Sequence, residues 1–185
     1  MKTLMLGLMS LNLLVWSIPL SAQDETKAIV CKQTYALCSA AKCTPNPRDN
    51  KKAICYCDNY DGLSAGTVSC EKRKPYQDSM GVMHVVSTFS FENDKLKGMT
   101  CPSGTRWTNC VNAPCTIDPT DSKKSICNCP IVATGEIIVF GANCNKHTGE
   151  NNFWSGALTT SHNFLGEALA KAKKIAPVKF DMCQP

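Results

Sequence analysis

The folding of this chain is governed by the stretch CSAAKCTPNPRDNKKAICYC, which runs from Cys38 to Cys57. It returns 72 residues later, from Cys110 to Cys129, as CVNAPCTIDPTDSKKSICNC. The two versions agree without a gap at eleven of twenty positions, which are four cysteines and seven other residues. Self-similarity at a fixed period is typical of a repeated structural unit. The sequence therefore predicts a tandem duplication of a cysteine framework.

Outer cysteines extend each version to six. The spacing is C-x6-C-x4-C-x11-C-x-C-x12-C in the first unit and C-x8-C-x4-C-x11-C-x-C-x14-C in the second. The predicted disulfide framework consists of Cys31, Cys38, Cys43, Cys55, Cys57 and Cys70, followed by Cys101, Cys110, Cys115, Cys127, Cys129 and Cys144. Each set of six allows 15 connectivities, and spacing alone does not choose among them.

Cys183 lies outside both units and makes the number of cysteines odd, at thirteen. Thirteen cysteines cannot all pair within one chain, so at least one thiol is left over. We expect Cys183 to be free or to form an intermolecular bond, which would give a disulfide-linked dimer. In the alternative, Cys183 pairs with a framework cysteine and leaves another one unpaired, such as Cys31 or Cys101.

Residues 1–22 have the features of a secretory signal peptide. Lys2 precedes an apolar run from Thr3 to Trp16, and the small residue Ala22 offers a cleavage site. A membrane span needs about 20 apolar residues, and this run is shorter and is followed by Pro19. We expect cleavage after Ala22, no membrane span, and a secreted or periplasmic protein in which disulfides persist.

The chain after Ala22 has 163 residues, with Lys+Arg 19 against Asp+Glu 15 and a formal net charge of +4. This modest excess does not favour nucleic acid as a partner. No Asn after Ala22 starts the Asn-x-Ser/Thr signal for N-glycosylation. That absence and the short positive segment at the start of the chain favour a bacterial protein.

The expected fold class is a small, disulfide-rich, β-rich α+β fold. A first cysteine-rich repeat at 23–97 is followed by a second repeat at 98–185, which includes a C-terminal helix. The boundary is expected near Asn93–Met99, where the segment Glu92–Gly98 is polar and turn-like.

Proline-rich turns predict strands at 52–58 and 124–129. Residues two apart in a strand point to one face, so Cys55 and Cys57 share a face and Tyr56 points away. The C-x4-C cysteines are the expected partners of each C-x-C pair.

Other segments have weaker patterns. The apolar spacing predicts a helix at Leu165–Ala176 that ends before Pro177, and Val82–Phe91 alternates like a half-buried strand. Thr34–Lys42 has the composition of a short helix, and its counterpart Arg106–Cys115 is a poorer helix candidate. A gapped similarity relates Val85–Phe91 to Leu158–Phe164.

The spacing of the cysteines does not favour a zinc site, because the tight pairs are C-x-C and C-x4-C, and no metal or other cofactor is expected. Nucleophilic catalysis requires a histidine, and the candidates are His84, His147 and His162. The two units have no histidine at equivalent positions, so no catalytic residue is assigned. An enzymatic function is therefore less favoured than binding. The G-x-S-x-G match at Gly62–Gly66 lies between framework cysteines, and we interpret it as a loop.

Two sets of residues are candidates for recognition. The basic run Lys72-Arg73-Lys74 would meet an acidic partner or a polyanionic glycan, although such runs are more often solvated surface. Trp107, Phe153 and Trp154 would anchor an interface if exposed, although core packing is the commoner fate of such residues.

The residues Tyr35-Ala36-Leu37-Cys38, Cys43 and Cys55-Tyr56-Cys57, with their second copy, resemble uncharacterised cysteine-rich exported proteins of Gram-negative bacteria. The resemblance implies bacterial export and assigns neither an activity nor a site. We expect an exported protein that binds a protein or a glycan at a cell surface or in the extracellular space. The alternatives are a hydrolase-like enzyme with a site between the repeats, using His147 or His162, and a protease inhibitor.

Overall fold

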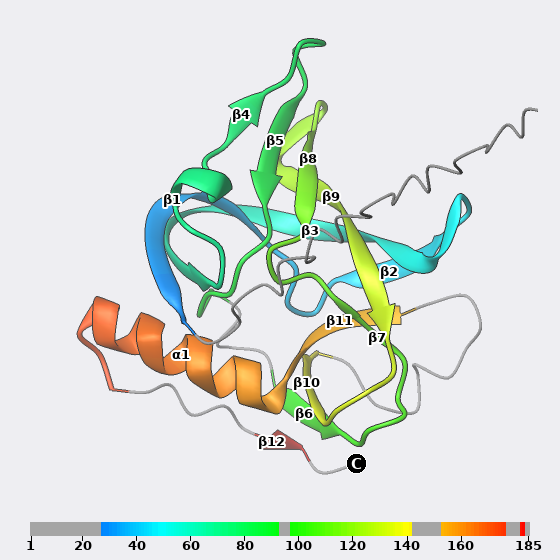
Figure 1. Cartoon of the computed structure of the whole chain (residues 1–185), viewed down its shortest axis with the longest axis vertical. Coiled ribbons are helices and arrows are strands. Elements are labelled where there is room, and N and C mark those ends of the chain that lie inside the picture. Colours follow the sequence, from blue (N-terminus) through cyan, green and yellow to red (C-terminus); the bar gives the residue numbers. More distant parts are fainter. Residues whose placement is uncertain (1–26, 93–96, 142–152, 177–181, 184–185) are drawn as a thin grey trace, which may run out of the picture.

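The computed structural model describes residues 27–92, 97–141, 153–176 and 182–183, and this part of the chain is mostly β-structure (Figure 1). The strands are β1 (Ile29–Leu37), β2 (Lys42–Asn46), β3 (Asp49–Gly66), β4 (Tyr76–Gln77), β5 (Met83–Val86), β6 (Gly98–Cys101), β7 (Trp107–Asn109), β8 (Pro114–Asp118), β9 (Asp121–Val132), β10 (Ile137–Phe140), β11 (Phe153–Leu158) and β12 (Met182–Cys183). The described residues also form a short 3-10 helix, η1 (Glu71–Arg73), and the helix α1 (Thr159–Lys173).

The expected α+β class is wrong, because the described residues form a mostly β structure with a single α-helix near the C-terminus. Most of the segment Thr34–Lys42, which we expected to be helical, belongs to β1 and to the turn after it. In the second unit, Arg106–Cys115 contributes β7 and the start of β8. Strand pairing overrides the local helix propensity of these short segments.

Each cysteine unit is built around a hairpin. β2 pairs with β3, and β8 pairs with β9, each with a register shift at the same place, after Pro45 and after Ile117. The turn aspartates Asp49 and Asp121 accept hydrogen bonds from the backbone N–H groups two residues later, at 3.0 and 2.9 Å. The strands expected at 52–58 and 124–129 are confirmed as parts of the longer β3 and β9.

The two hairpins lie side by side in the sheet, because β3 and β9 pair antiparallel with Cys55 opposite Cys127. Two closed circuits of paired strands share this β3–β9 pair. One circuit runs β3–β9–β7–β11–β2 and returns to β3. The other runs β9–β3–β1, crosses the bridge between Ala36 and Ser87 to the end of β5, and returns through β8.

Equivalent positions in the two circuits form the same kinds of bridge and hydrogen bond. Ala36 forms a parallel bridge with Ser87, and 72 residues after Ala36, Thr108 forms a parallel bridge with Ser155. Ser87 N–H donates to Ala113 O at 2.9 Å, and Ser155 N–H donates to Ala41 O at 3.0 Å. The turns that precede β2 and β8 each place a non-glycine residue in the left-handed region, with φ of 66° at residue 40 and 60° at residue 112.

These bridges correct one sequence-based expectation. The counterpart of Val85–Ser87 is Phe153–Ser155, because both segments lie against the edge strand of the opposite hairpin. The gapped similarity with Leu158–Phe164 is wrong, since most of that segment belongs to α1.

The disulfides agree with the expected pairing of C-x4-C with C-x-C. In the first unit, Cys38 bonds Cys57 and Cys43 bonds Cys55, and in the second unit, Cys110 bonds Cys129 and Cys115 bonds Cys127. Cys31 bonds Cys70, and Cys101 is disulfide-bonded as well. Neither Cys31 nor Cys101 is therefore the leftover thiol. The side chains of Cys144 and Cys183 lie outside the described residues, so the odd cysteine stays a prediction.

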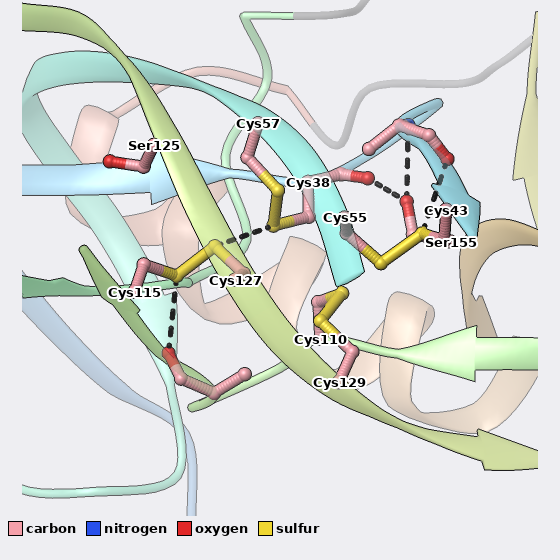
Figure 2. The surroundings of a disulfide bond; sticks show 12 residues. Cys38, Cys43, Cys55, Cys57, Cys110, Cys115, Ser125, Cys127, Cys129 and Ser155 are labelled. Carbon is pink, nitrogen blue, oxygen red and sulfur yellow. Dashed lines mark hydrogen bonds between the residues drawn. A yellow bond between two sulfur atoms is a disulfide. The ribbon is translucent and has the colours of Figure 1, made fainter. Parts of the chain in front are cut away.

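Disulfides of both units pack together in one buried core on the inner face of the paired strands β3 and β9 (Figure 2). Cys38 Sγ lies 3.4 Å from Cys127 Sγ. Both atoms belong to disulfides and carry no hydrogen, so this is a van der Waals contact between bridges. Ser155 adds a polar tie, since its hydroxyl donates to Cys38 O and accepts from Ala41 N–H at 3.1 Å.

Helix α1 begins at Thr159 and ends at Lys173, whereas we expected Leu165–Ala176. Its first turn is polar, so the apolar periodicity does not reveal where it starts. Lys174 takes φ 56° and ends the helix before Pro177. Leu165 and Leu169 pack with Phe89 and Phe91 in a small core of their own. None of the helices among the described residues has the length and apolar character that a membrane span requires.

Candidate functional site

Arg73, the centre of the expected basic recognition run, is fully buried, with 0 % exposure, so it is not a surface residue. Its Nη2 donates to Ile29 O at 2.7 Å, and its carbonyl accepts from Gln33 Nε2 at 2.7 Å. A Cβ on Gly66 would come within 2.8 Å of Arg73 Nη1, so this guanidinium needs a glycine beside it. Burial lowers the pKa of Arg73 from its ordinary value. Arg73 therefore stabilises the first unit through hydrogen bonds to Ile29 and Gln33.

Its neighbours Lys72 and Lys74 are exposed. Lys74 lies 2.9 Å from Glu71, an ion pair between exposed groups that contributes little to stability. With its central charge buried and one flank paired, the run does not form a basic patch.

The aromatic candidates divide between core and surface. Trp107 and Phe153 are buried, at 1 % and 2 % exposure, in keeping with the core packing that was the commoner expectation, so neither presents its ring to a partner. Trp154 is half-buried, and Lys42 Nζ lies 5.6 Å from the centre of its ring. Alternation along β11 puts Phe153 inside and Trp154 outside.

The buried sulfurs do not form a metal site in this oxidised state. The Sγ atoms of Cys38, Cys115 and Cys127 lie within 4.8 Å of one another, as do those of Cys38, Cys110 and Cys129. All of these cysteines are in disulfides, and zinc requires thiolates.

The three candidate histidines lie in different surroundings. His147 lies outside the described residues. His162 is buried on α1 between Phe89 and Phe140, with ring centroids at 5.2 and 5.8 Å, and burial lowers its pKa. His84 lies on β5 at the surface. The G-x-S-x-G match at Gly62–Gly66 lies within β3 rather than in a loop, and it has none of the strand-turn-helix geometry of a nucleophile elbow.

His84 belongs to a row of side chains on the solvent-facing side of the sheet, which we call the outer row. Its members pair directly across five adjacent strands, from β4 to β5, β8, β9 and β3. In order, they are Tyr76, His84, Thr116, Ile126 and Tyr56. They alternate in sequence with the inward-facing row Val85, Cys115, Cys127 and Cys55.

The outer row exposes apolar and aromatic surface. Tyr76 is 57 % exposed, Tyr56 61 % and Ile126 38 %. Exposed aromatic side chains in one patch mark interaction sites more often than single exposed residues do. A sheet fixed by disulfides on its other side holds these rings in place.

Asp78 fixes His84. The Asp78 carboxylate can only accept, so His84 Nε2 donates to Oδ2 at 2.9 Å. This hydrogen bond, with backbone N–H groups from Val82 and Met80, holds the pKa of Asp78 below its usual range. The imidazole stacks on Tyr76, with ring centroids 4.8 Å apart and planes at 16°. Thr116 Oγ1 lies 3.5 Å from Nδ1, at the long limit of a hydrogen bond.

A shallow groove of about 430 Å³ runs beside the outer row. Its lining comes from both units: Asn46, Ile54, Tyr76, His84, Pro114, Cys115, Thr116, Ile126, Cys127 and Asn128. Asn46 Nδ2 donates to Asn128 Oδ1 at 3.2 Å, which joins the two hairpins at the surface. Within the described residues, the Asn128 NH2 group makes no hydrogen bond to the protein, so it is available as a donor.

Comparison of the chain with protein-family models, with curated protein sequences and with solved structures found no match. The site is therefore argued from its own geometry. The sequence alone does not reveal this site, because Tyr56, Ile126 and Tyr76 lie far apart in the chain. The available signal was alternation, which puts Tyr56 and Ile126 on the face opposite the cysteines.

Proposed function

We propose that this protein is exported and acts by binding a partner through the outer row and its groove. The observation that carries the proposal is the exposed row of Tyr76, Ile126 and Tyr56 on a sheet stapled by disulfides. Tyrosine contributes large contact area with few rotatable bonds, so a fixed Tyr surface loses little entropy on binding.

Export outside the cytoplasm is part of the same proposal. The disulfides of both units favour an oxidising compartment, and residues 1–22 have the pattern of a signal peptide. The matching bridges and turns of the two units favour an origin by tandem duplication.

Binding is favoured over hydrolysis by the arrangement around His84. A nucleophile needs its base within about 2.6–3.2 Å, and Thr116 Oγ1 lies 3.5 Å from His84 Nδ1. His162, the other described candidate, is buried among Phe89 and Phe140. Burial between these rings keeps the His162 side chain away from solvent.

The test is surface plasmon resonance of the oxidised protein against immobilised extracellular proteins and polysaccharides, using wild type, Tyr56→Ala and Tyr76→Ala. Any ligand that binds wild type should bind each variant at least about tenfold more weakly, as expected for aromatic anchors. Ile175→Ala is the matched control, because Ile175 is exposed at 46 % and follows α1, outside the outer row and the groove. Absence of any ligand, or a ligand that binds both tyrosine variants as well as wild type, would overturn the proposal.

A further inference from the structure

We infer that the groove beside the outer row binds a neutral glycan, an inference that rests on the proposed function and specifies its ligand. A volume of about 430 Å³ is within the range of small-ligand sites, roughly 300–1,000 Å³. The groove is open to solvent, and its lining spans strands β2, β3, β4, β5, β8 and β9, so a ligand there would contact both hairpins.

The lining combines the two kinds of group that a sugar requires. Sugars present apolar C–H faces and a ring of hydroxyls, so they are bound by flat aromatic surfaces and by neutral hydrogen-bonding groups. Tyr76 gives an exposed ring at one end of the groove, and His84 stacks beneath it at 4.8 Å. Asn46, Asn128 and Thr116 give amide and hydroxyl groups along the floor.

The polar groups of the groove are held in position before binding. Asp78 fixes the imidazole of His84, and the Asn46–Asn128 hydrogen bond orients the Asn128 amide. Immediately beneath, the Cys115–Cys127 disulfide connects the two strands that carry Thr116, Ile126 and Asn128. Prior ordering reduces the entropy lost on binding, which matters for a ligand as strongly hydrated as a sugar.

The charges favour an uncharged ligand. The lining contains no Asp, Glu, Lys or Arg, and its cysteines are in disulfides. Two lysines on strands that line the groove are in ion pairs within the sheet, Lys52 with Asp49 at 3.4 Å and Lys124 with Asp58. Lys42, which does not line the groove, lies over the Trp154 ring. Single-stranded nucleic acid and acidic polysaccharides require a positively charged groove, and these residues do not supply one.

The experiment measures binding of the oxidised protein to three sets of immobilised probes. The neutral set is cellohexaose, mannohexaose and chitohexaose, the acidic set is heparin and hyaluronan, and the protein set is fibronectin and collagen. Wild type should bind at least one neutral oligosaccharide, with little change between 50 and 500 mM NaCl. Tyr76→Ala and Asn128→Ala should each weaken that binding at least about tenfold.

Controls separate loss of the site from loss of the fold. Tyr76 and Asn128 are exposed, so both variants should keep the far-UV circular dichroism and thermal midpoint of wild type. Tyr76→Phe keeps the ring and should retain binding within about threefold, and Ile175→Ala should bind like wild type.

The outcomes distinguish the two proposals. Binding only to acidic or protein probes that is lost in Tyr76→Ala would overturn the neutral-glycan inference and leave the proposed binding face standing. Neutral-glycan binding that is unchanged in Tyr56→Ala, Tyr76→Ala and Asn128→Ala would overturn both. Failure to bind any of the three sets would also count against both.

Discussion

The β2–β3 hairpin carries Tyr56 on its outer face where the β8–β9 hairpin carries Asn128, although Cys55 and Cys127 beneath them form matching bridges. The same contrast holds for the strand that pairs with the edge of each hairpin. Trp154 of β11 pairs with β2 at the position where Val86 of β5 pairs with β8. The inward-facing residues are constrained by the disulfides and by packing against the other unit. The outward-facing residues are free of both constraints, so the two units can differ there without loss of the fold.

The largest expected effect comes from removing either of two equivalent disulfides on the inner faces of the hairpins. Cys43–Cys55 and Cys115–Cys127 each close a loop with a sequence separation of 12 and pair residues directly across a hairpin. The chain-entropy model gives about 3 kcal/mol for a loop of this size. Replacing either pair with alanine should therefore lower the free energy of unfolding by a similar amount, measured by guanidinium denaturation of the two double variants. Costs that differ by more than about 1.5 kcal/mol would show that the two bridges are not energetically equivalent.

A second prediction concerns Arg73, which braces β1 of the first unit. Arg73→Ala should lower the free energy of unfolding by about 2–4 kcal/mol, because it removes buried packing and leaves Ile29 O without its donor. Arg73→Met keeps most of the volume and removes the buried charge, so it should cost less than half as much. Equal costs for the two variants in urea denaturation would show that the charged hydrogen bond, not the packing, is what stabilises the unit.

A third prediction uses His162, which belongs to the helix that follows the second unit. Burial places its folded-state pKa below the ordinary value of 6.5, so the unfolded state takes up the proton first. Stability is therefore full above about pH 6.5 and should fall as the pH is lowered through 6.5 toward the depressed folded pKa. His162→Phe should flatten the dependence of the thermal midpoint on pH between 7 and 5, compared with wild type. An unchanged slope in the variant would assign the dependence to other groups.

The smallest expected effect on stability comes from exchanging the outer faces. Tyr56→Asn and Asn128→Tyr each place on one hairpin the residue of the other, and both positions are exposed. Surface substitutions of this kind usually change stability by less than about 0.5 kcal/mol. Thermal unfolding should therefore show little change, whereas binding should be lost at least in part by Tyr56→Asn. A large loss of stability in either variant would mean that the outer face contributes to folding as well as to recognition.

Much of the framework could be predicted from the sequence, because its signals are local. Two-residue alternation places Cys55 and Cys57 on one face, and the proline turn brings Cys43 and Cys38 back across the strand. The helix at the C-terminus was also visible, although its polar first turn hid its start at Thr159.

The candidate site could not be predicted in the same way. Lys72, Arg73 and Lys74 are consecutive in sequence and similar in charge, yet only the central one is buried, because η1 turns it toward Ile29 and Gln33. The indoles of Trp107 and Trp154 were equally good candidates for exposure, and the strand register decided between them. Register between distant strands leaves no trace in a local pattern.

The sequence by itself indicated two similar cysteine units, since the repeated C-x4-C-x11-C-x-C spacing places a proline turn before a strand whose C-x-C cysteines share one face. Only the tertiary structure decided that β3 and β9 pair with Cys55 opposite Cys127. That pairing buries the sulfurs of both units between the hairpins and aligns Tyr76, His84, Thr116, Ile126 and Tyr56 in one outer row. The physical reason is that cysteine spacing constrains contacts within a unit, whereas the face offered to a partner depends on strand pairing between units.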